Sequence, residues 1–201
     1  MASNAYDEVY RAPVAPPWDL GAPQPALARM LAEGRVRGPR VLDVGCGPGD
    51  LAIALARHGF DVTAVDVSPV AIDIARTRAA NAGVAVHFEV QDATTLSLPP
   101  APFDSVFDSG LLHSLLRVGE AEADRYLALL PGLAAPGATV FVLAMSVTAA
   151  QGWGVTEAYL RAKFAEPHWT DTEVDDIEIA ADLKPGSLSL AGFLVRTLRA
   201  G

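Results

Sequence analysis

The sequence predicts an α/β fold built on a largely parallel β-sheet. From residue 40 onward, short runs rich in Val, Ile and Phe alternate with Ala/Leu/Arg segments of helical periodicity, which is the pattern of β-α-β units. A glycine-rich turn follows the first of these runs. Near the C-terminus a Pro-Gly pair separates two further strand-like runs, which indicates a hairpin and hence an antiparallel pair at the edge of the sheet.

Composition limits the class of protein. The chain has 201 residues with a formal net charge of −9, and 51% of the residues are hydrophobic, which is enough for one folded domain. The acidic balance disfavours nucleic acid and anionic membranes as partners. A single cysteine excludes an internal disulfide, and four scattered histidines predict no metal site. The N-terminus has neither a basic start nor an apolar run, so we expect a cytoplasmic protein, either a monomer or a small homo-oligomer.

The elements follow in a regular order. Strands are expected at 40–44, 61–65, 85–90, 105–108 and 138–144, and helices at 49–58, 69–82 and 120–130. Ser68 followed by Pro69 is typical of a helix start, and Gly83 is a plausible stop. Beyond the fifth strand we expect a helix at about 155–165 and the two strands of the hairpin at 173–179 and 192–198.

The first 39 residues have a different composition. Five prolines crowd around Trp18, and a helix is expected at 26–33. This segment cannot form a strand and is too apolar to extend freely into water. We therefore expect residues 1–39 to lie across the rest of the chain as a lid or strap, and residues 38–201 to form the main domain.

The strongest local signal is the segment VLDVGCGPGD at 41–50. Its three glycines let the backbone approach a ligand closely, and the helix that follows offers unpaired N–H groups. A dinucleotide fingerprint wants Gly or Ala at position 50, where this chain has Asp50. Asp43, two residues before the first glycine, would repel a pyrophosphate but attract an ammonium group. These two acids argue against a nicotinamide oxidoreductase.

Two further acids follow the next two strands. Asp66 ends the second strand, where a carboxylate can accept both hydroxyl groups of a ribose. Asp92 follows the third strand, where it can meet the exocyclic amine of an adenine. Ligands bind at this end of an open parallel sheet. An adenosine that carries an α-amino acid and no phosphate fits these acids together with Asp43.

The motifs VLDVGCGPGD, AVDVSP, VQDATTL and FDSVFDSGLLHSL, in this order over about residues 38–146, resemble the class I S-adenosylmethionine-dependent methyltransferases. The resemblance implies a Rossmann-like, doubly wound sheet of seven strands, with the last strand antiparallel and helices on both faces. It also implies S-adenosylmethionine as the methyl donor and S-adenosylhomocysteine as the product. The cofactor-binding residues that it implies are Asp43, Gly45, Cys46, Gly47 and Gly49 for the methionine part, Asp66 for the ribose, and Val67, Asp92 and Ala93 for the adenine.

A second resemblance concerns the acceptor. The segment VAPPWDLGAPQPAL at 14–27 resembles the opening of the thiopurine, thiol and halide methyltransferase group, which implies that Trp18 contacts S-adenosylmethionine. Trp18 could equally serve as a packing anchor for the strap. Sulfur of a small molecule is accordingly the favoured acceptor atom, with oxygen or nitrogen of a phenol, quinol or heterocycle as the alternative. A module that binds S-adenosylmethionine without turnover remains as a third interpretation.

The segment DSGLLHSLL at 108–116 should border the transferred methyl group. Asp108 and Ser109 lie at the strand tip, where they can touch cofactor or acceptor, and His113 is the candidate general base. A histidine in such a leucine-rich turn can also simply pack. A sulfonium methyl is already activated, so in-line alignment supplies much of the acceleration, and a thiolate or halide needs no base. Aromatic residues before the first strand and after the fifth could wall an apolar pocket: Tyr6, Tyr10, Trp153, Tyr159, Phe164 and Trp169. For Tyr159 and Phe164 we favour the alternative that they form the core face of the helix at about 155–165.

Overall fold

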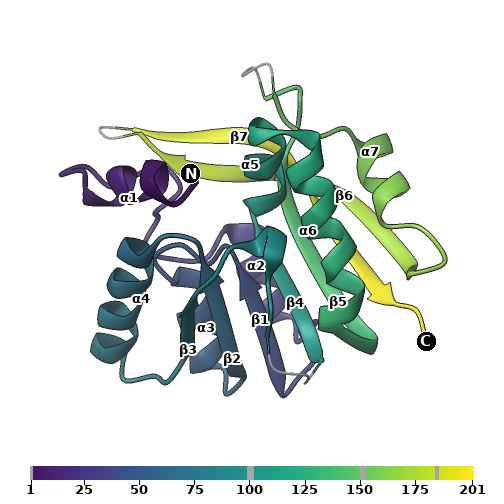
Figure 1. The fold of residues 1–201 in the computed structure, drawn as a ribbon, viewed down its shortest axis with the longest axis horizontal. Coiled ribbons are helices and arrows are strands. Elements are labelled where there is room, and N and C mark those ends of the chain that lie inside the picture. The colour runs from purple at the N-terminus through teal and green to yellow at the C-terminus, as the bar shows by residue number, and fades with distance from the viewer. Residues whose placement is uncertain (1, 99–101, 150–152, 184–185) are drawn as a thin grey trace.

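A computed structural model describes residues 2–98, 102–149, 153–183 and 186–201 of the chain. It contains one seven-stranded sheet of order β3-β2-β1-β4-β5-β7-β6, in which β7 is antiparallel to both its neighbours (Figure 1). The predicted seven-stranded, mostly parallel sheet with an antiparallel last strand is therefore confirmed. The strands are β1 (Arg40–Val44), β2 (Asp61–Asp66), β3 (His87–Val90), β4 (Phe103–Ser109), β5 (Ala134–Met145), β6 (Trp169–Asp182) and β7 (Ser187–Arg199).

Helices cover both faces of the sheet (Figure 1). Residues of α2, α3 and α4 pack on one face, and residues of α5, α6 and α7 pack on the other. The helices are α1 (Ala2–Arg11), α2 (Pro25–Ala32), α3 (Asp50–Arg57), α4 (Pro69–Ala82), α5 (Leu111–Val118), α6 (Glu120–Leu133) and α7 (Glu157–Lys163), with a short 3₁₀ turn, η1 (Ala93–Thr95).

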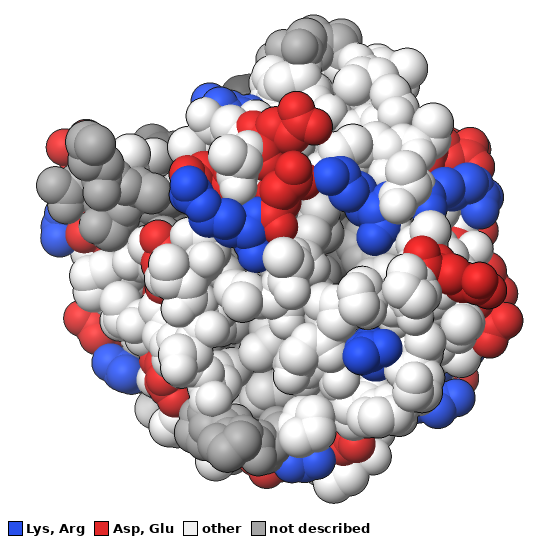
Figure 2. Space-filling view, turned by 45° about the vertical axis from the view of Figure 1, so that its right-hand side comes forward, with Lys and Arg blue, Asp and Glu red and all other residues white. Residues whose placement is uncertain are grey.

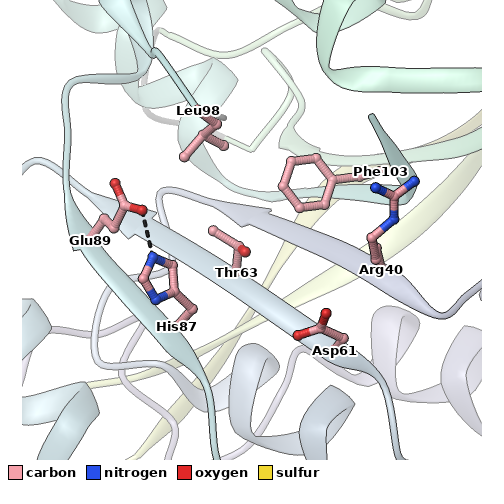
Figure 3. A pocket seen from close by; sticks show the side chains of 7 residues that line it. All are labelled: Arg40, Asp61, Thr63, His87, Glu89, Leu98 and Phe103. Carbon is pink, nitrogen blue, oxygen red and sulfur yellow. Dashed lines mark hydrogen bonds and ion pairs between the residues drawn. The ribbon is translucent and has the colours of Figure 1, made fainter. Parts of the chain in front are cut away.

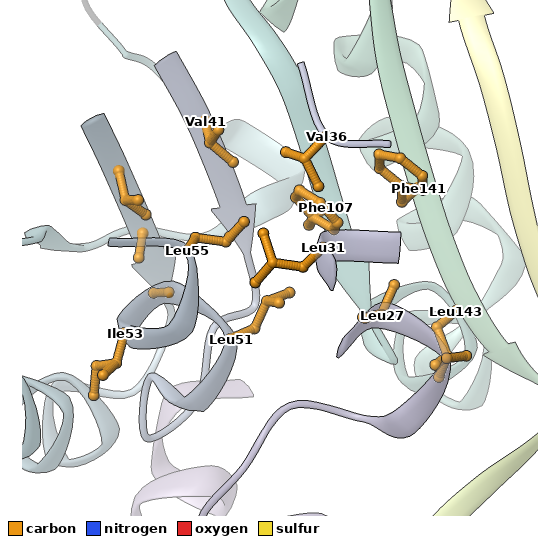
Figure 4. Packing of buried hydrophobic residues seen from close by; sticks show 14 of the residues in the cluster. Leu27, Leu31, Val36, Val41, Leu51, Ile53, Leu55, Phe107, Phe141 and Leu143 are labelled. Atoms are coloured by element: carbon orange, nitrogen blue, oxygen red, sulfur yellow. The ribbon is translucent and has the colours of Figure 1, made fainter. Parts of the chain in front are cut away.

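The core on the α2–α3 face places leucines against two stacked rings. Phe107 of β4 and Phe141 of β5 lie 4.7 Å apart, nearly parallel, and both are fully buried. Figure 4 shows Leu27 and Leu31 of α2 next to Leu51 of α3, all directed toward the strands. Because this packing holds α2 beneath the sheet, it also fixes where the N-terminal segment crosses the molecule.

Parallel register brings the ends of the strands to one edge. Val44 pairs with Val65 on one side and with Asp108 on the other, and Asp66 pairs with Val90. The loops that follow β1, β2, β3 and β4 therefore open at the same edge of the sheet. This is the edge at which open α/β folds bind ligands.

Most predicted elements are present, with shifted bounds. Ser68 caps α4 by accepting a hydrogen bond from the Ala71 N–H at 3.2 Å, Pro69 occupies the first helical position, and Gly83 ends the helix with φ of 66°. The final hairpin is longer than predicted, since β6 and β7 span 14 and 13 residues. Its expected tip at Lys184 and Pro185 lies outside the described residues.

Two helices were not predicted. α1 is mostly polar. A buried hydrogen bond connects it to the start of α4, because the hydroxyl of the capping residue Ser68 donates to the Asp7 carboxylate. α5 follows Gly110, whose φ of 103° starts the helix directly after β4. The leucines of α5 recur at helical spacing, at Leu111, Leu112, Leu115 and Leu116, so the signal for this helix was present in the sequence and was missed.

The surface carries mixed charge. On the face shown in Figure 2, described Lys and Arg side chains alternate with Asp and Glu side chains instead of forming one basic patch. None of the helices in the described part of the chain is long and apolar enough to cross a membrane.

Candidate active site

A cavity of about 420 Å³ opens at the carboxyl edge of the parallel strands. Its walls come from α1, the segment that follows α1, the glycine turn after β1, the start of α5, and the hairpin of β6 and β7. The sequence-predicted residues that line it are Trp18, Asp43, Gly45, Cys46, Gly47, Asp66, Val67, Asp92, Ala93, Ser109 and His113. Residues that are distant in sequence thus meet at one site.

Asp43 is the most unusual group in this cavity. Its side chain is 1% exposed, and neither carboxylate oxygen has a hydrogen-bond partner among the described residues. Burial, together with the carboxylates of Asp108 and Asp66, raises the pKa of Asp43 to about 8. The Ala52 N–H partly offsets this without reaching hydrogen-bond geometry. A buried carboxylate without a partner is a strong site for a cationic group.

The three glycines of the turn after β1 have two different roles. Gly45 and Gly47 line the cavity with φ of 72° and 52°. Gly49 does not line it, contrary to the sequence interpretation. A Cβ on Gly49 would lie 2.9 Å from the Cβ of Ala75 and 3.3 Å from the ring of Phe88. The third glycine therefore lets α3 approach α4 and β3 closely.

Cys46 is half-buried in the same turn, and its thiol lies 3.6 Å from the Gly47 carbonyl oxygen. Burial, together with the carboxylates of Asp43 and Asp66, raises the pKa of the Cys46 thiol. A thiol held neutral is a poor nucleophile, so the residue serves as a small wall of the cavity.

Asp66 holds the turn as well as facing the cavity. One of its oxygens accepts a hydrogen bond from the Gly47 N–H at 2.8 Å, and the other accepts from the Ser68 N–H at 2.9 Å. Burial raises the pKa of Asp66, while these amides act in the opposite direction. Its carboxylate is thus oriented by the backbone, with the cavity on its remaining side.

Asp92 lies at the outer end of the cavity. Its carboxylate accepts hydrogen bonds from the Thr94 N–H at 2.8 Å and from the Thr94 hydroxyl at 2.7 Å, which starts the η1 turn. Ala93 is buried beside it and Val67 is partly buried. These three residues line one part of the cavity, called the slot below, with two aliphatic side chains and a carboxylate.

Asp108 is not among the residues that line the cavity, although the sequence made it a candidate catalytic group. It is 1% exposed and accepts hydrogen bonds from the backbone N–H groups of Gly110, Leu111 and Leu112 at 2.7–3.3 Å. Burial raises its pKa to about 7, and these amides oppose the rise. The Asp108 carboxylate therefore positions the first turn of α5, while Ser109 next to it does reach the cavity.

α5 directs His113 and Arg117, one helical turn apart, toward the cavity. The Nδ1 atom of His113 accepts a hydrogen bond from the Met145 N–H at 3.2 Å, and its ring lies 5.6 Å from that of Trp153. Arg117 lies over the same Trp153 ring at 4.7 Å. His113 and Arg117 thus form a polar part of the cavity wall, in contact with the ring of Trp153.

The N-terminal segment crosses the cavity and is tied down on both sides. Gln24 exchanges two hydrogen bonds of 2.9 Å with the backbone of Ala180 in β6. Trp18, 47% exposed, donates to the Tyr10 hydroxyl at 3.1 Å. Residues 2–24 thus lie beside α4 at one end and the final hairpin at the other.

Arg78 of α4 anchors this segment from below. Its guanidinium contacts the carboxylate of Asp19 through two bonds of 2.7 and 2.8 Å, and that of Asp50 at 3.0 Å. Replacing the Arg78 guanidinium by an amide would leave the two partly buried carboxylates without their cation. We expect Arg78→Gln to lower the free energy of unfolding by about 1–3 kcal/mol. Thermal unfolding checks this against Arg161→Gln, which removes an exposed pair with Glu157 on α7; equal losses in the two variants would contradict the anchoring.

The final hairpin supplies a wall that the sequence analysis missed. Ile179, Leu188 and Leu190 line the cavity beside Met145 at the end of β5. The alternation of Ile177 and Ile179 with acidic residues was the available signal, since alternate residues of a strand share one face. It was interpreted only as an edge strand. Of the aromatic residues that could wall a pocket, Tyr6, Tyr10 and Trp153 line the cavity. Tyr159 and Phe164 belong to the core beneath α6 and α7, as the sequence favoured, and Trp169 joins them there instead of lining the cavity.

A second, smaller cavity of about 180 Å³ lies at the opposite ends of the same strands, lined by Arg40, Asp61, Thr63, His87, Glu89, Leu98 and Phe103. In Figure 3 the His87 ring points to Glu89, and the two atoms Nε2 and Oε1 are 2.6 Å apart. Its polar side chains are thus partly engaged with one another, and it is separate from the carboxyl edge.

Residues 41–132 match a family described as methyltransferase domain. The chain is 35% identical over 174 residues to 2-heptyl-1-hydroxyquinolin-4(1H)-one methyltransferase of Mycobacteroides abscessus, covering 82% of this chain and 72% of that protein. It is 32% identical over 189 residues to a ubiquinone biosynthesis O-methyltransferase of Xanthomonas campestris pv. campestris, covering 86% of this chain and 75% of that protein.

A solved structure is also similar along the whole chain. It comes from work on the conversion of a disulfide bond into a thioacetal group during echinomycin biosynthesis. The TM-score is 0.87 and the identity 32%, and the match covers 100% of this chain and 93% of that one.

Proposed function

The chain belongs to the class I S-adenosylmethionine-dependent methyltransferases, and from that premise we propose that it methylates a ring-borne oxygen of a small apolar acceptor. S-adenosylmethionine is its methyl donor. The observation that carries the proposal is the shape of the main cavity, which joins a partnerless buried carboxylate, Asp43, to a compartment of aromatic and aliphatic side chains. The first part suits a charged amino acid group, and the second suits the apolar ring of an acceptor.

The cavity fits the methyl donor at three places. Asp43 would hold the ammonium of its methionine part, with the backbone of the Gly45–Gly47 turn and the wall at Cys46 next to it. Asp66 would accept from the ribose hydroxyls. The adenine would lie in the slot of Val67, Asp92 and Ala93, and Trp18 and Ser109 would contact the donor from the strap and from the tip of β4. Support comes from their common position along one cavity.

The acceptor would enter on the opposite side, between α5 and the final hairpin. Leu188 and Leu190 offer aliphatic contacts there, and Trp153 offers a ring face. During transfer, the carbon–sulfur bond of the sulfonium breaks and its electron pair stays on sulfur, while a lone pair of the acceptor forms the new bond to carbon. What the protein supplies is alignment of the two reactants and exclusion of water.

Oxygen is the first choice of acceptor atom because of the two curated relatives. One is named for a substrate with a hydroxyl group on a heteroaromatic ring, and the other is named as an O-methyltransferase. Sulfur, which the N-terminal motif favoured, is the second candidate. The similar structure concerned with a disulfide and a thioacetal supports it.

The N-terminal residues 1–39 would act as a lid over this reaction, packed on the domain of residues 38–201. The ties of Gln24 to Ala180 and of Arg78 to Asp19 support this role. A segment that covers both reactants would keep water away from the sulfonium.

An acceptor panel tests the proposal. S-adenosylhomocysteine release would be measured with a hydroxyquinolone, a hydroquinone, an aryl thiol, iodide and a heteroaromatic amine. We expect turnover with the two ring hydroxyls. Turnover confined to the thiol and iodide would replace oxygen by sulfur, and binding of S-adenosylmethionine without release from any acceptor would favour a non-catalytic binding module.

A further inference from the structure

Resting on the proposed function, we propose that the acceptor is methylated as its anion, held by a hydrogen bond from Nε2–H of His113 with Arg117 at the mouth of the cavity. In this arrangement His113 is a hydrogen-bond donor and removes no proton. The enzyme would therefore select acceptors that are ionised near neutral pH, such as acidic ring hydroxyls or thiols. The carbon–sulfur electron pair returns to sulfur, the anion supplies the pair for the new bond, and no proton is transferred.

The tautomer of His113 carries the argument. Its Nδ1 accepts the Met145 N–H at 3.2 Å, so Nδ1 holds a lone pair and not a proton. A neutral imidazole has one N–H, which must then lie on Nε2. Nε2 has no hydrogen-bond partner among the described residues, and the side chain lines the cavity. The group that His113 presents to a ligand is thus an N–H.

The surroundings keep the ring neutral. Burial, together with the positive charge of Arg117, lowers the pKa of His113 to about 4. Accepting a second proton would require Nδ1 to give up the Met145 amide, leaving two N–H groups facing each other. The same contact that makes His113 a donor therefore prevents it from acting as a general base.

Arg117 supplies the positive charge that an anionic acceptor needs. It lies one turn beyond His113 on α5, exposed at the mouth, with its guanidinium 4.7 Å from the centre of the Trp153 ring. The ring of Trp153 also contacts His113, so all three side chains form one wall. A cation that guides an anion toward an N–H donor favours ionised acceptors.

The other titratable groups of the cavity lie on different elements. The carboxylates are Asp43 on β1, Asp50 on α3, Asp66 on β2 and Asp92 after β3, and the phenols are Tyr6 and Tyr10 on α1. Arg117 is the charged group that shifts the pKa of His113. Negative charge is thus concentrated on the donor side of the cavity and positive charge on the acceptor side.

Two substitutions of equal chemistry and different length provide the first test. The amide N–H of Gln in His113→Gln reaches the position of Nε2, whereas the shorter side chain of His113→Asn ends near Nδ1. We expect His113→Gln to retain kcat/KM within about threefold and His113→Asn to lose about 10- to 50-fold, the value of a hydrogen bond to a charged group. Equal and nearly complete loss of kcat in both variants would assign His113 as a base and overturn the proposal.

Bound probe provides a readout that needs no turnover. A nitrophenol that absorbs visibly only when ionised would be titrated with pH on the protein loaded with S-adenosylhomocysteine. We expect binding to lower the apparent pKa of the probe, the shift to shrink in Arg117→Gln, and Arg125→Gln on the exposed side of α6 to leave it unchanged. An unchanged or raised pKa of the bound probe would contradict an anion-binding wall.

The pH dependence of kcat/KM separates this proposal from the underlying function. Its inflection should move with the pKa of the phenol when the acceptor is exchanged. An inflection that stays at one pH for every acceptor would indicate a base on the protein, and the proposal would be wrong while methyl transfer itself stood. Absence of turnover for the whole panel, with the probe still bound as its anion, would instead contradict the proposed function.

Discussion

Asp43→Asn is expected to weaken S-adenosylmethionine binding by about 100-fold or more while raising the melting temperature of the ligand-free protein at pH 9. The loss follows because a neutral amide cannot neutralise the ammonium group that a partnerless buried carboxylate would accept. The gain follows because a buried charge without a partner is unfavourable in the free protein. Calorimetric affinity and thermal unfolding measure the two effects in the same samples.

The added stability of the ligand-free Asp43→Asn variant should increase with pH. An unfolded Asp ionises near pH 4, whereas burial raises the pKa of Asp43 in the folded chain to about 8. The folded state thus holds an extra proton between these values, and its stability falls as the pH rises through them. We expect the free energy of unfolding of the variant to exceed that of the wild type by about 5 kcal/mol, or roughly 12 °C in melting temperature, at pH 9, and the difference to vanish near pH 4.

Binding of S-adenosylmethionine should depend on the same proton of Asp43. Below pH 8 the wild type must release a proton from Asp43 when the ammonium binds, so affinity should rise with pH toward 8 and calorimetry should detect the released proton. Asp73→Asn, which changes an exposed carboxylate on α4, is the matched control. Unchanged affinity in a folded Asp43→Asn variant would remove Asp43 from the binding site.

Gly49→Ala should destabilise this chain more than Gly59→Ala, which calibrates it. Both glycines have φ of 87°, so both variants bear the cost of a left-handed residue, about 1 kcal/mol. Nothing lies within 4 Å of a Cβ on Gly59, whereas a Cβ on Gly49 meets Ala75 and Phe88. Overpacking adds about 1–3 kcal/mol.

The comparison decides what the third glycine does. We expect the melting temperature to fall by roughly 3 °C in Gly59→Ala and by roughly 10 °C in Gly49→Ala. If Gly49 mainly admitted the ligand, the two melting temperatures would fall equally and only Gly49→Ala would lose affinity for S-adenosylmethionine. Thermal unfolding with and without ligand separates these outcomes.

The fold and the cofactor half of the candidate site were largely predictable. Alternating strand and helix patterns, the Ser68–Pro69 start and the glycine turn are local signals, and parallel register then brings Asp43, Asp66 and Asp92 to one edge whatever packs around it. Their positions depend on which residue ends each strand, and the chain displays that directly. The family resemblance rests on these same local motifs.

Packing decided what local patterns could not show. Gly45 and Gly49 look alike in the sequence, yet one lines the cavity and the other admits Ala75 and Phe88, because the difference depends on which helix lies behind each. Asp108 looked like a group facing the reactants, but the backbone amides that begin α5 turn it inward. Such roles arise only when separate elements are in contact.

The acceptor side shows the same division. The sequence by itself determined the class of fold, the order of its strands along the chain and the acids at their ends, since these follow from periodicity and spacing over a few residues. Only the tertiary structure decided that Met145 of β5 donates to His113 and that Leu188 of the last hairpin lines the same cavity. Hydrogen-bond direction and pocket shape depend on residues 32 or more positions apart, and no local pattern encodes that distance.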